Sequence, residues 1–251
     1  MKFKIMYMFG KPPARSSTWL AILVLTLSIG TLQAQNRDNE VPEHRVQFRV
    51  MAMTGVIRDM AFVQNLEPIP FNVSPTHPTA WMEYRGPGPL NFYHAGDLEN
   101  IEDMQNPEEV PQPVAQFNPP SSGEWLLLFV RQDASGSSGT FRVVAIPEDN
   151  DAVTEGIRFY NLTGEPLGID VNNENFLLQA GRRNHMNPEP GPRNAMNMKI
   201  AAQGESGWEV ISSTVFGHRP NARITYYILM IDNRIRFKRF LDRVPQPEDP
   251  S

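Results

Sequence analysis

Apolar and polar side chains alternate with a period of two along many short segments of this chain. In residues 45–53, for example, Val46, Phe48 and Val50 fall on one face and Arg49 falls on the other. This pattern is typical of β-strands that bury one face. The 23 prolines, spread along the sequence, oppose long helices. Other segments of the same kind are 79–84, 89–93, 125–130, 141–146, 157–162, 167–171, 176–179, 208–216, 223–231 and 234–241.

Roughly eleven to thirteen short strands with turn residues between them predict an all-β fold. We expect an antiparallel β-sandwich, either immunoglobulin-like or built as two stacked small β-sandwich halves. Residues 125–130 are apolar on both faces, which predicts a central strand. No fixed-period repeat is evident. The expected core includes Phe48, Val50, Trp81, Leu126, Leu128, Val143, Phe159, Trp208, Tyr226 and Ile228.

The first 34 residues predict a signal peptide. Four basic residues and no acidic ones accompany the apolar run 19–29, and the small residue Ala34 stands at the expected cleavage position. A bilayer span needs about 20 apolar residues, more than this run supplies. Cleavage near Ala34 is therefore preferred to a retained N-terminal anchor, and we expect a periplasmic or extracellular bacterial protein.

Composition divides the rest of the chain into three parts. Residues 35–43 are polar and predict a flexible tether, whereas residues 44–243 show the strand pattern and predict the β-sandwich domain. Residues 244–251 are rich in proline and predict a disordered tail. After the leader, no stretch is long and apolar enough to span a membrane.

Charge and cysteine content exclude several classes of function. Without the leader the chain has 19 Lys and Arg against 28 Asp and Glu, a net charge of −9. Such an acidic chain is not expected to bind nucleic acid. It has no cysteine, which rules out disulfides, thiolate metal sites and cysteine nucleophiles.

No motif for a metal, a cofactor or a nucleophile is found. The five histidines lack zinc-ligand spacing, and the acidic segments 97–109 and 147–155 lack the calcium-loop pattern. We therefore expect neither a metal nor a cofactor. Paired carboxylates for glycoside hydrolysis cannot be recognised from spacing, so candidates on or beside strands stay open: Glu83, Glu124, Asp170 and Glu209.

Two basic groups are candidate contacts for an anion or a partner. Arg234, Arg236 and Lys238 share one face of the last predicted strand, and His218 and Arg219 lie in a turn between two strands. The row on the strand would suit an anionic polymer, but charge on an edge strand also prevents edge-to-edge pairing, and we favour that interpretation. For the turn we favour an ordinary surface loop.

Four segments carry a resemblance to a family of exported bacterial β-rich proteins of unknown function. They are Trp81-Met-Glu-Tyr-Arg-Gly-Pro87, Leu126-Leu-Leu-Phe129, Arg158-Phe-Tyr-Asn-Leu-Thr163 and Phe216-Gly-His-Arg-Pro220. The resemblance would cover most of the mature chain. It implies a β-rich exported protein, but since that family has no assigned activity it implies no site residues.

These observations favour an exported, non-enzymatic binding or scaffold protein of the cell envelope with an unknown ligand. Its expected partner is an envelope polymer or another envelope protein. The alternative is a carbohydrate-active hydrolase that uses dispersed carboxylates.

Overall fold

The computed structural model describes residues 43–98, 111–120, 122–132, 140–148 and 154–244. All of them belong to one compact unit, residues 40–251. The predicted signal peptide, the tether up to residue 42 and the tail beyond Val244 lie outside the described residues.

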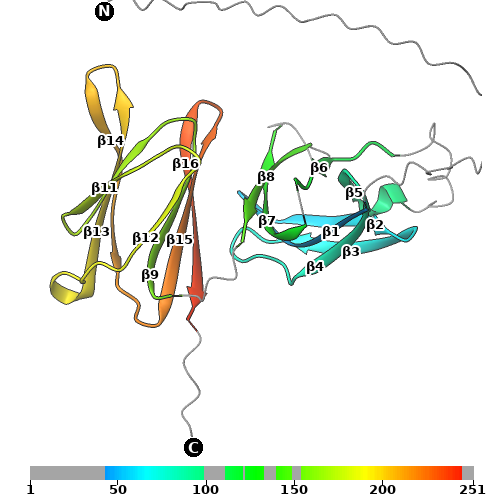
Figure 1. The fold of residues 1–251 in the computed structure, drawn as a ribbon, viewed down its shortest axis with the longest axis horizontal. Coiled ribbons are helices and arrows are strands. Elements are labelled where there is room, and N and C mark those ends of the chain that lie inside the picture. The colour runs from blue at the N-terminus through cyan, green and yellow to red at the C-terminus, as the bar shows by residue number, and fades with distance from the viewer. Residues whose placement is uncertain (1–42, 99–110, 121, 133–139, 149–153, 245–251) are drawn as a thin grey trace, which may run out of the picture. The chain divides into compact units, whose positions relative to one another are not determined.

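The described chain is all β, as predicted, with its strands arranged in four four-stranded sheets (Figure 1). The first eight strands build an N-terminal sandwich from sheet A, in the order β4-β1-β7-β8, and sheet B, in the order β3-β2-β5-β6. The elements are β1 Glu43–Ala52, β2 Ile57–Gln64, β3 Glu67–Val73, β4 Met82–Pro87, β5 Leu90–His94, the 3-10 turn η1 Ala95–Leu98, β6 Ala115–Phe117, β7 Gly123–Arg131 and β8 Phe141–Pro147.

The core of the N-terminal sandwich is rich in phenylalanine. Phe48 on β1 is fully buried between the two sheets. Its ring packs edge-on against Phe62 at 5.3 Å and against Phe92 at 5.9 Å between centroids. Edge-to-face pairs of this kind add roughly 0.5–1.5 kcal/mol beyond the burial of area, so this cluster fixes sheet A on sheet B.

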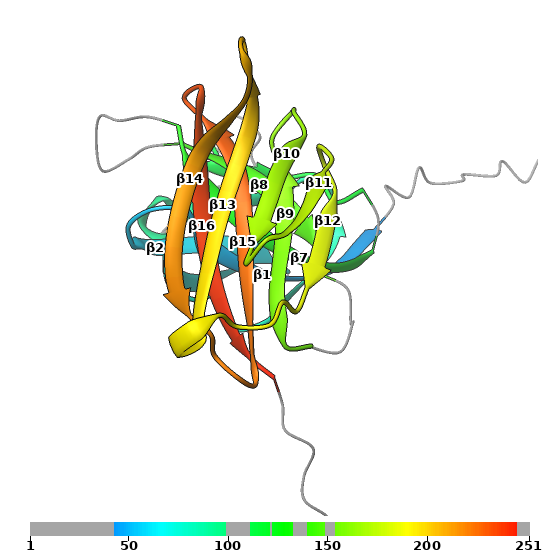
Figure 2. The ribbon, with the colours of Figure 1, turned by 90° about the vertical axis from the view of Figure 1, so that its left-hand side faces the viewer.

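The C-terminal sandwich consists of sheet C, in the order β12-β9-β15-β16, and sheet D, in the order β11-β10-β13-β14 (Figure 2). Its separate core includes Phe159 and Tyr226, whose rings stack at 5.6 Å. The elements are β9 Gly156–Leu162, β10 Leu167–Val171, β11 Glu174–Leu178, β12 Arg183–Met186, the 3-10 turn η3 Pro192–Asn194, β13 Ala195–Gly204, β14 Gly207–Gly217, β15 Ala222–Ile231 and β16 Arg234–Arg243.

The two sandwiches have the same topology. Adding eight to each strand number of sheets A and B gives the strand orders of sheets C and D. Each sandwich also contains one parallel pair, β1 with β7 and β9 with β15, within otherwise antiparallel sheets. Of the two predicted arrangements, the structure therefore has the two stacked smaller sandwiches. This structural repeat was not evident in the sequence because the two sandwiches share the order in which their strands pair and not a pattern of residues.

Sheets A and C pack against each other through a third buried cluster. On the side of sheet A it contains Leu126 and Leu128, and on the side of sheet C it contains Tyr227 and Leu229. The central strands of both sheets are therefore covered on both faces. This arrangement confirms the prediction that residues 125–130 form a central strand, because β7 lies between β1 and β8 and is buried from Leu126 to Val130.

Directional polar contacts also join the two sandwiches. The Lys238 ammonium group on β16 donates a hydrogen bond to the Met53 carbonyl oxygen at 3.0 Å. The Arg142 guanidinium group on β8 donates to the Met230 carbonyl oxygen at 3.1 Å. The Arg49 guanidinium group lies 5.9 Å from the centroid of the Phe240 ring. These contacts favour one register of sheet A on sheet C.

Several local predictions were wrong. Strands β2, β3, β6, β12 and β13 are not among the predicted segments. Strand β3 escaped notice because Pro68 and Pro70 argue against a strand, but β3 is an edge strand, where proline is tolerated. Trp81 and Trp208, expected in the core, are 46% and 50% exposed.

Candidate functional site

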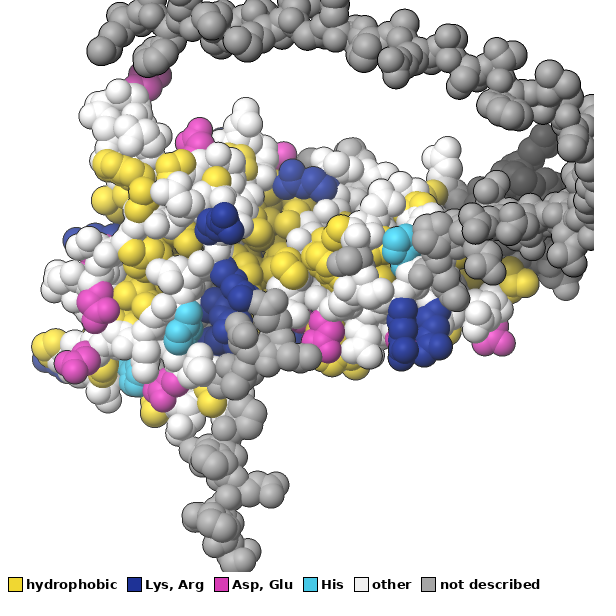
Figure 3. All heavy atoms as spheres, viewed as in Figure 1, with side chains coloured by type: hydrophobic (Ala, Val, Ile, Leu, Met, Phe, Trp, Pro, Cys, Tyr) yellow, Lys and Arg dark blue, Asp and Glu magenta, His cyan; other side chains and the backbone are white. Residues whose placement is uncertain are grey.

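The three residues of the predicted basic row on β16 differ in their exposure. Arg234 and Arg236 are exposed, and β16 is the edge strand of sheet C, as the edge-protection interpretation requires. On the face drawn in Figure 3, Lys and Arg side chains are scattered among hydrophobic and acidic ones. Lys238, by contrast, is only 8% exposed, and burial lowers the pKa of its ammonium group. The prediction that Lys238 is a surface contact is therefore wrong: it faces sheet A and binds the Met53 carbonyl oxygen.

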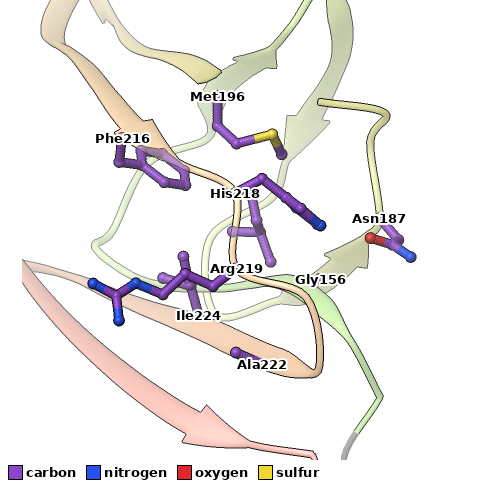
Figure 4. Close-up of a pocket in the computed structure, with 9 residues that line it drawn as sticks. Gly156, Asn187, Met196, Phe216, His218, Arg219, Ala222 and Ile224 are labelled. Atoms are coloured by element: carbon purple, nitrogen blue, oxygen red, sulfur yellow. The ribbon is translucent and has the colours of Figure 1, made fainter. Parts of the chain in front are cut away.

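His218 and Arg219 follow β14 and line a small cavity (Figure 4). The cavity has room for about 10 Å³, close to what one water molecule needs. The imidazole Nε2 of His218 lies 3.4 Å from a carboxylate oxygen of Glu155. Figure 4 shows the side chains of His218 and Arg219 pointing to opposite sides of the turn. The two side chains therefore diverge at this cavity, although both residues also line a neighbouring open groove of about 480 Å³ together with Arg243.

A second histidine near this cavity has a perturbed ionisation. The Nε2 atom of His185 on β12 lies 2.9 Å from the Glu155 carbonyl oxygen. Burial lowers the pKa of His185 below its ordinary value of 6.5, and the nearby charges of Arg158 and Arg223 lower it further. The unfolded chain therefore binds a proton at this residue more readily than the folded chain does.

This shift predicts a pH-dependent stability. Because the folded-state pKa of His185 is depressed, we expect the free energy of unfolding to fall as the pH drops below about 6.5. His185→Gln should reduce this dependence, whereas His77→Gln, at an exposed position, should not. Urea unfolding at a series of pH values measures the effect. An identical pH slope in the wild type and in His185→Gln would contradict the prediction.

The four candidate carboxylates do not form one site. Glu83 lies on sheet A and is paired with Arg45 at 2.9 Å and with Arg85 at 2.6 Å. Glu124 lies on the same sheet, separated from Glu83 by strand β1. The other two candidates, Asp170 and Glu209, belong to sheet D.

Asp170 and Glu209 point to opposite faces of sheet D. Glu209 is paired with Ala202, which faces the core, whereas Asp170 lies between the core residues Ile169 and Val171 and faces outward. Asp170 lines a groove of about 630 Å³.

The outward face of sheet D carries exposed apolar side chains. Leu177, Gly168, Ala201 and Val210 are direct cross-strand neighbours and form a row across all four strands. Because the sequence neighbours of Gly168 and Ala201 face the core, this row faces away from it. The large exposed side chains of this face, which we call the sheet D patch, are Leu177 (51% exposed), Trp208 (50%), Val210 (62%) and Val215 (66%).

The indole of Trp208 lies close to Gly168. A Cβ atom placed on Gly168 would lie 3.7 Å from Cε3 and Cζ3 of the indole and 3.7 Å from Ala201 Cβ. The absence of a side chain at Gly168 therefore leaves room for this edge of the ring, and Trp208 remains half exposed. Sequence analysis missed this arrangement because alternation places Trp208 on a face but does not show what covers that face.

A groove of about 630 Å³ adjoins the sheet D patch. Asp170, at its edge, lies two residues from Gly168 on the same face of β10, a distance of roughly 7 Å. The groove residues that bear hydrogen-bonding side chains are Asp170, Asn172, Asn173, Glu174, Glu189, Asn197 and Lys199. The segment Pro190–Pro192 also lines the groove. We call this feature the sheet D groove.

The corresponding face of sheet B is covered. Leu98 of η1, in the connection between β5 and β6, packs over Ala61 and Tyr93, which are 0% and 5% exposed. In the C-terminal sandwich the equivalent connection, between β13 and β14, is the two-residue turn 205–206. Nothing comparable therefore lies over the sheet D patch within the described residues.

Comparisons with known proteins give no match from which a function could be transferred, so the function is argued from the fold and from the geometry of sheet D. No protein-family model matches the chain, and no curated protein matches it. Within the described residues, no helix has the length and apolarity to cross a membrane. In the same part of the chain, no three His, Asp or Glu side chains gather as metal ligands would. The structure defines a tandem β-sandwich protein with an open apolar and polar surface on sheet D.

Proposed function

We propose that this chain is an exported, non-enzymatic binding or scaffold protein of a bacterial cell envelope, and that the outward face of sheet D is its binding surface. The basic and apolar leader supports export. The main observation in support of the binding surface is a difference between the two sandwiches, which share one topology. The outward face of sheet B is covered by η1, whereas that of sheet D exposes four large apolar side chains. Exposed apolar patches rimmed by polar residues mark interaction sites.

Placing a charge in the sheet D patch should abolish binding to envelope material. Val210→Asp puts a carboxylate among apolar side chains that a partner would desolvate, and we expect retention on a sedimented bacterial envelope fraction to fall roughly tenfold or more. Val56→Asp is the matched control, since Val56 is 57% exposed in the N-terminal sandwich. Equal retention of the two variants would refute this assignment of the surface.

The same assay tests the basic edge strand. In the double variant Arg234→Glu, Arg236→Glu, only exposed side chains are changed. If these arginines only protect the edge of sheet C, its retention stays at the wild-type level. Loss of retention in this variant, with Val210→Asp unaffected, would move the binding surface to β16.

The alternative function, a carbohydrate-active hydrolase, has one observation in its favour. Asp170 lines the sheet D groove together with Glu174 and Glu189, and glycoside hydrolysis needs two carboxylates across the scissile bond. Release of reducing ends from envelope glycans by the wild type, and none by Asp170→Asn, would establish this alternative.

A further inference from the structure

We propose that the sheet D patch and the sheet D groove together bind a polysaccharide that is neutral or carries amino groups, with Trp208 as the stacking platform. This inference rests on the proposed function and names the class of ligand. A sugar ring has apolar C–H faces and a rim of hydroxyl groups that both donate and accept hydrogen bonds. It therefore fits a site that joins a flat aromatic surface to a polar groove.

The aromatic surface of the proposed site is the indole of Trp208. An edge of the indole of Trp208 lies over Gly168, where a Cβ atom would be 3.7 Å from Cε3 and Cζ3, and Trp208 is half exposed. A rigid aromatic ring loses little conformational freedom on binding. Leu177 and Val210 extend the apolar surface to the two edges of the sheet.

The wall of the groove is fixed before any ligand arrives. The Asn172 amide group donates to the Glu189 carbonyl oxygen at 2.8 Å and accepts from the Asn197 backbone amide at 2.8 Å. These bonds tie the segment that starts at Glu189 to strand β13. Pro190 and Pro192 further restrict the backbone of that segment. A preformed wall lowers the entropic cost of binding.

Charge selects among glycans. The groove contains three carboxylates, those of Asp170, Glu174 and Glu189, and one ammonium group, that of Lys199. Its net formal charge of −2 would repel uronic acids and phosphorylated polymers and would accept neutral or amino-bearing sugars. The side chains combine donors and acceptors, as sugar hydroxyl groups require.

An array of immobilised oligosaccharides tests the proposal with the mature chain. The array carries neutral hexose, N-acetylhexosamine, hexosamine and uronic acid oligomers. We expect binding to the neutral or the amino-bearing classes, and Trp208→Ala should weaken it roughly tenfold or more. Trp81→Ala is the matched control, because Trp81 is 46% exposed in the N-terminal sandwich, and its affinity should stay within about twofold.

A second variant keeps the test valid if Trp208→Ala does not fold. Lys199→Glu changes an exposed groove residue and should shift preference further towards the amino-bearing oligomers. Stronger binding of uronic acids than of neutral sugars by the wild type would overturn the inference. So would glycan binding that Trp208→Ala and Lys199→Glu both leave unchanged.

Other outcomes separate this inference from the proposed function. If no oligosaccharide binds while Val210→Asp still abolishes envelope retention, the ligand class is wrong and the binding surface stands. If the bound oligomers are cleaved, the hydrolase alternative replaces both. If Trp208→Ala converts a dimer to a monomer without any glycan binding, the occupant of the patch is a second copy of this chain.

Discussion

Replacing Leu128 with arginine is expected to separate the two sandwiches while leaving each of them folded. Leu128 is fully buried in the cluster between sheets A and C. The facing sheet already carries Arg158, Arg223 and Lys238, each no more than 8% exposed. The carboxylates of Glu148 and Asp242 are already paired with Arg49 and Arg223, and an uncompensated buried charge costs roughly 3–5 kcal/mol.

The separation can be measured by its physical consequences. Each sandwich has a core of its own, so unfolding of Leu128→Arg should change from one transition to two, and the hydrodynamic radius should rise. Val56→Arg adds the same charge at an exposed position and should change neither quantity. A single transition and an unaltered radius in Leu128→Arg would show that the third cluster does not hold the sandwiches together.

Phe48→Ala is expected to destabilise the N-terminal sandwich by about 3–5 kcal/mol. The substitution empties a site that is 0% exposed and removes edge-to-face contacts with Phe62 and Phe92. Domains of this kind are stable by only about 5–15 kcal/mol. Much of the stability of the first sandwich should therefore be lost, whereas the core around Phe159 is untouched.

Hydrogen exchange resolved by segment distinguishes the two sandwiches. Protection should fall in β1, β2, β5 and β7 and persist in β9 and β15. Phe71→Ala is the control: Phe71 packs at the margin of the same cluster, 6.3 Å from Phe62 and 6.0 Å from Phe92, and is only partly buried. Its loss should cost clearly less. Equal losses for Phe48→Ala and Phe71→Ala would contradict the central role of Phe48.

The paired architecture gives the two sandwiches different tasks under the proposed function. Sheets A and C are occupied by their mutual contact, and sheet B is covered by η1. Sheet D alone among the four presents a large apolar and polar outward face within the described residues. The N-terminal sandwich then acts as a support that holds the C-terminal sandwich.

The sequence predicted the fold class well because strand formation depends mainly on the pattern of neighbouring residues. Alternation in residues 45–53 and the two-sided apolar run 125–130 each correspond to a strand with the expected exposure. Asp232 and Asn233 both have positive φ angles in the turn between β15 and β16, as expected for a two-residue hairpin. These features depend only on neighbouring residues.

The candidate site was harder to predict because burial depends on distant segments. Alternation correctly placed Arg234, Arg236 and Lys238 on one face of β16. It gave no sign that sheet A, from the other sandwich, covers Lys238 and leaves the two arginines exposed.

For Trp208 the sequence pattern failed in the opposite way, because it predicted a buried side chain that is in fact half exposed. Its alternation matches a core strand, but β13 and β14 join through a two-residue turn, and no described segment covers the ring as η1 covers sheet B. The sequence by itself determined which segments are strands and which side chains share a face, since both follow from backbone geometry. Only the tertiary structure decided which faces meet, because strand pairing and sheet packing join residues far apart in the chain.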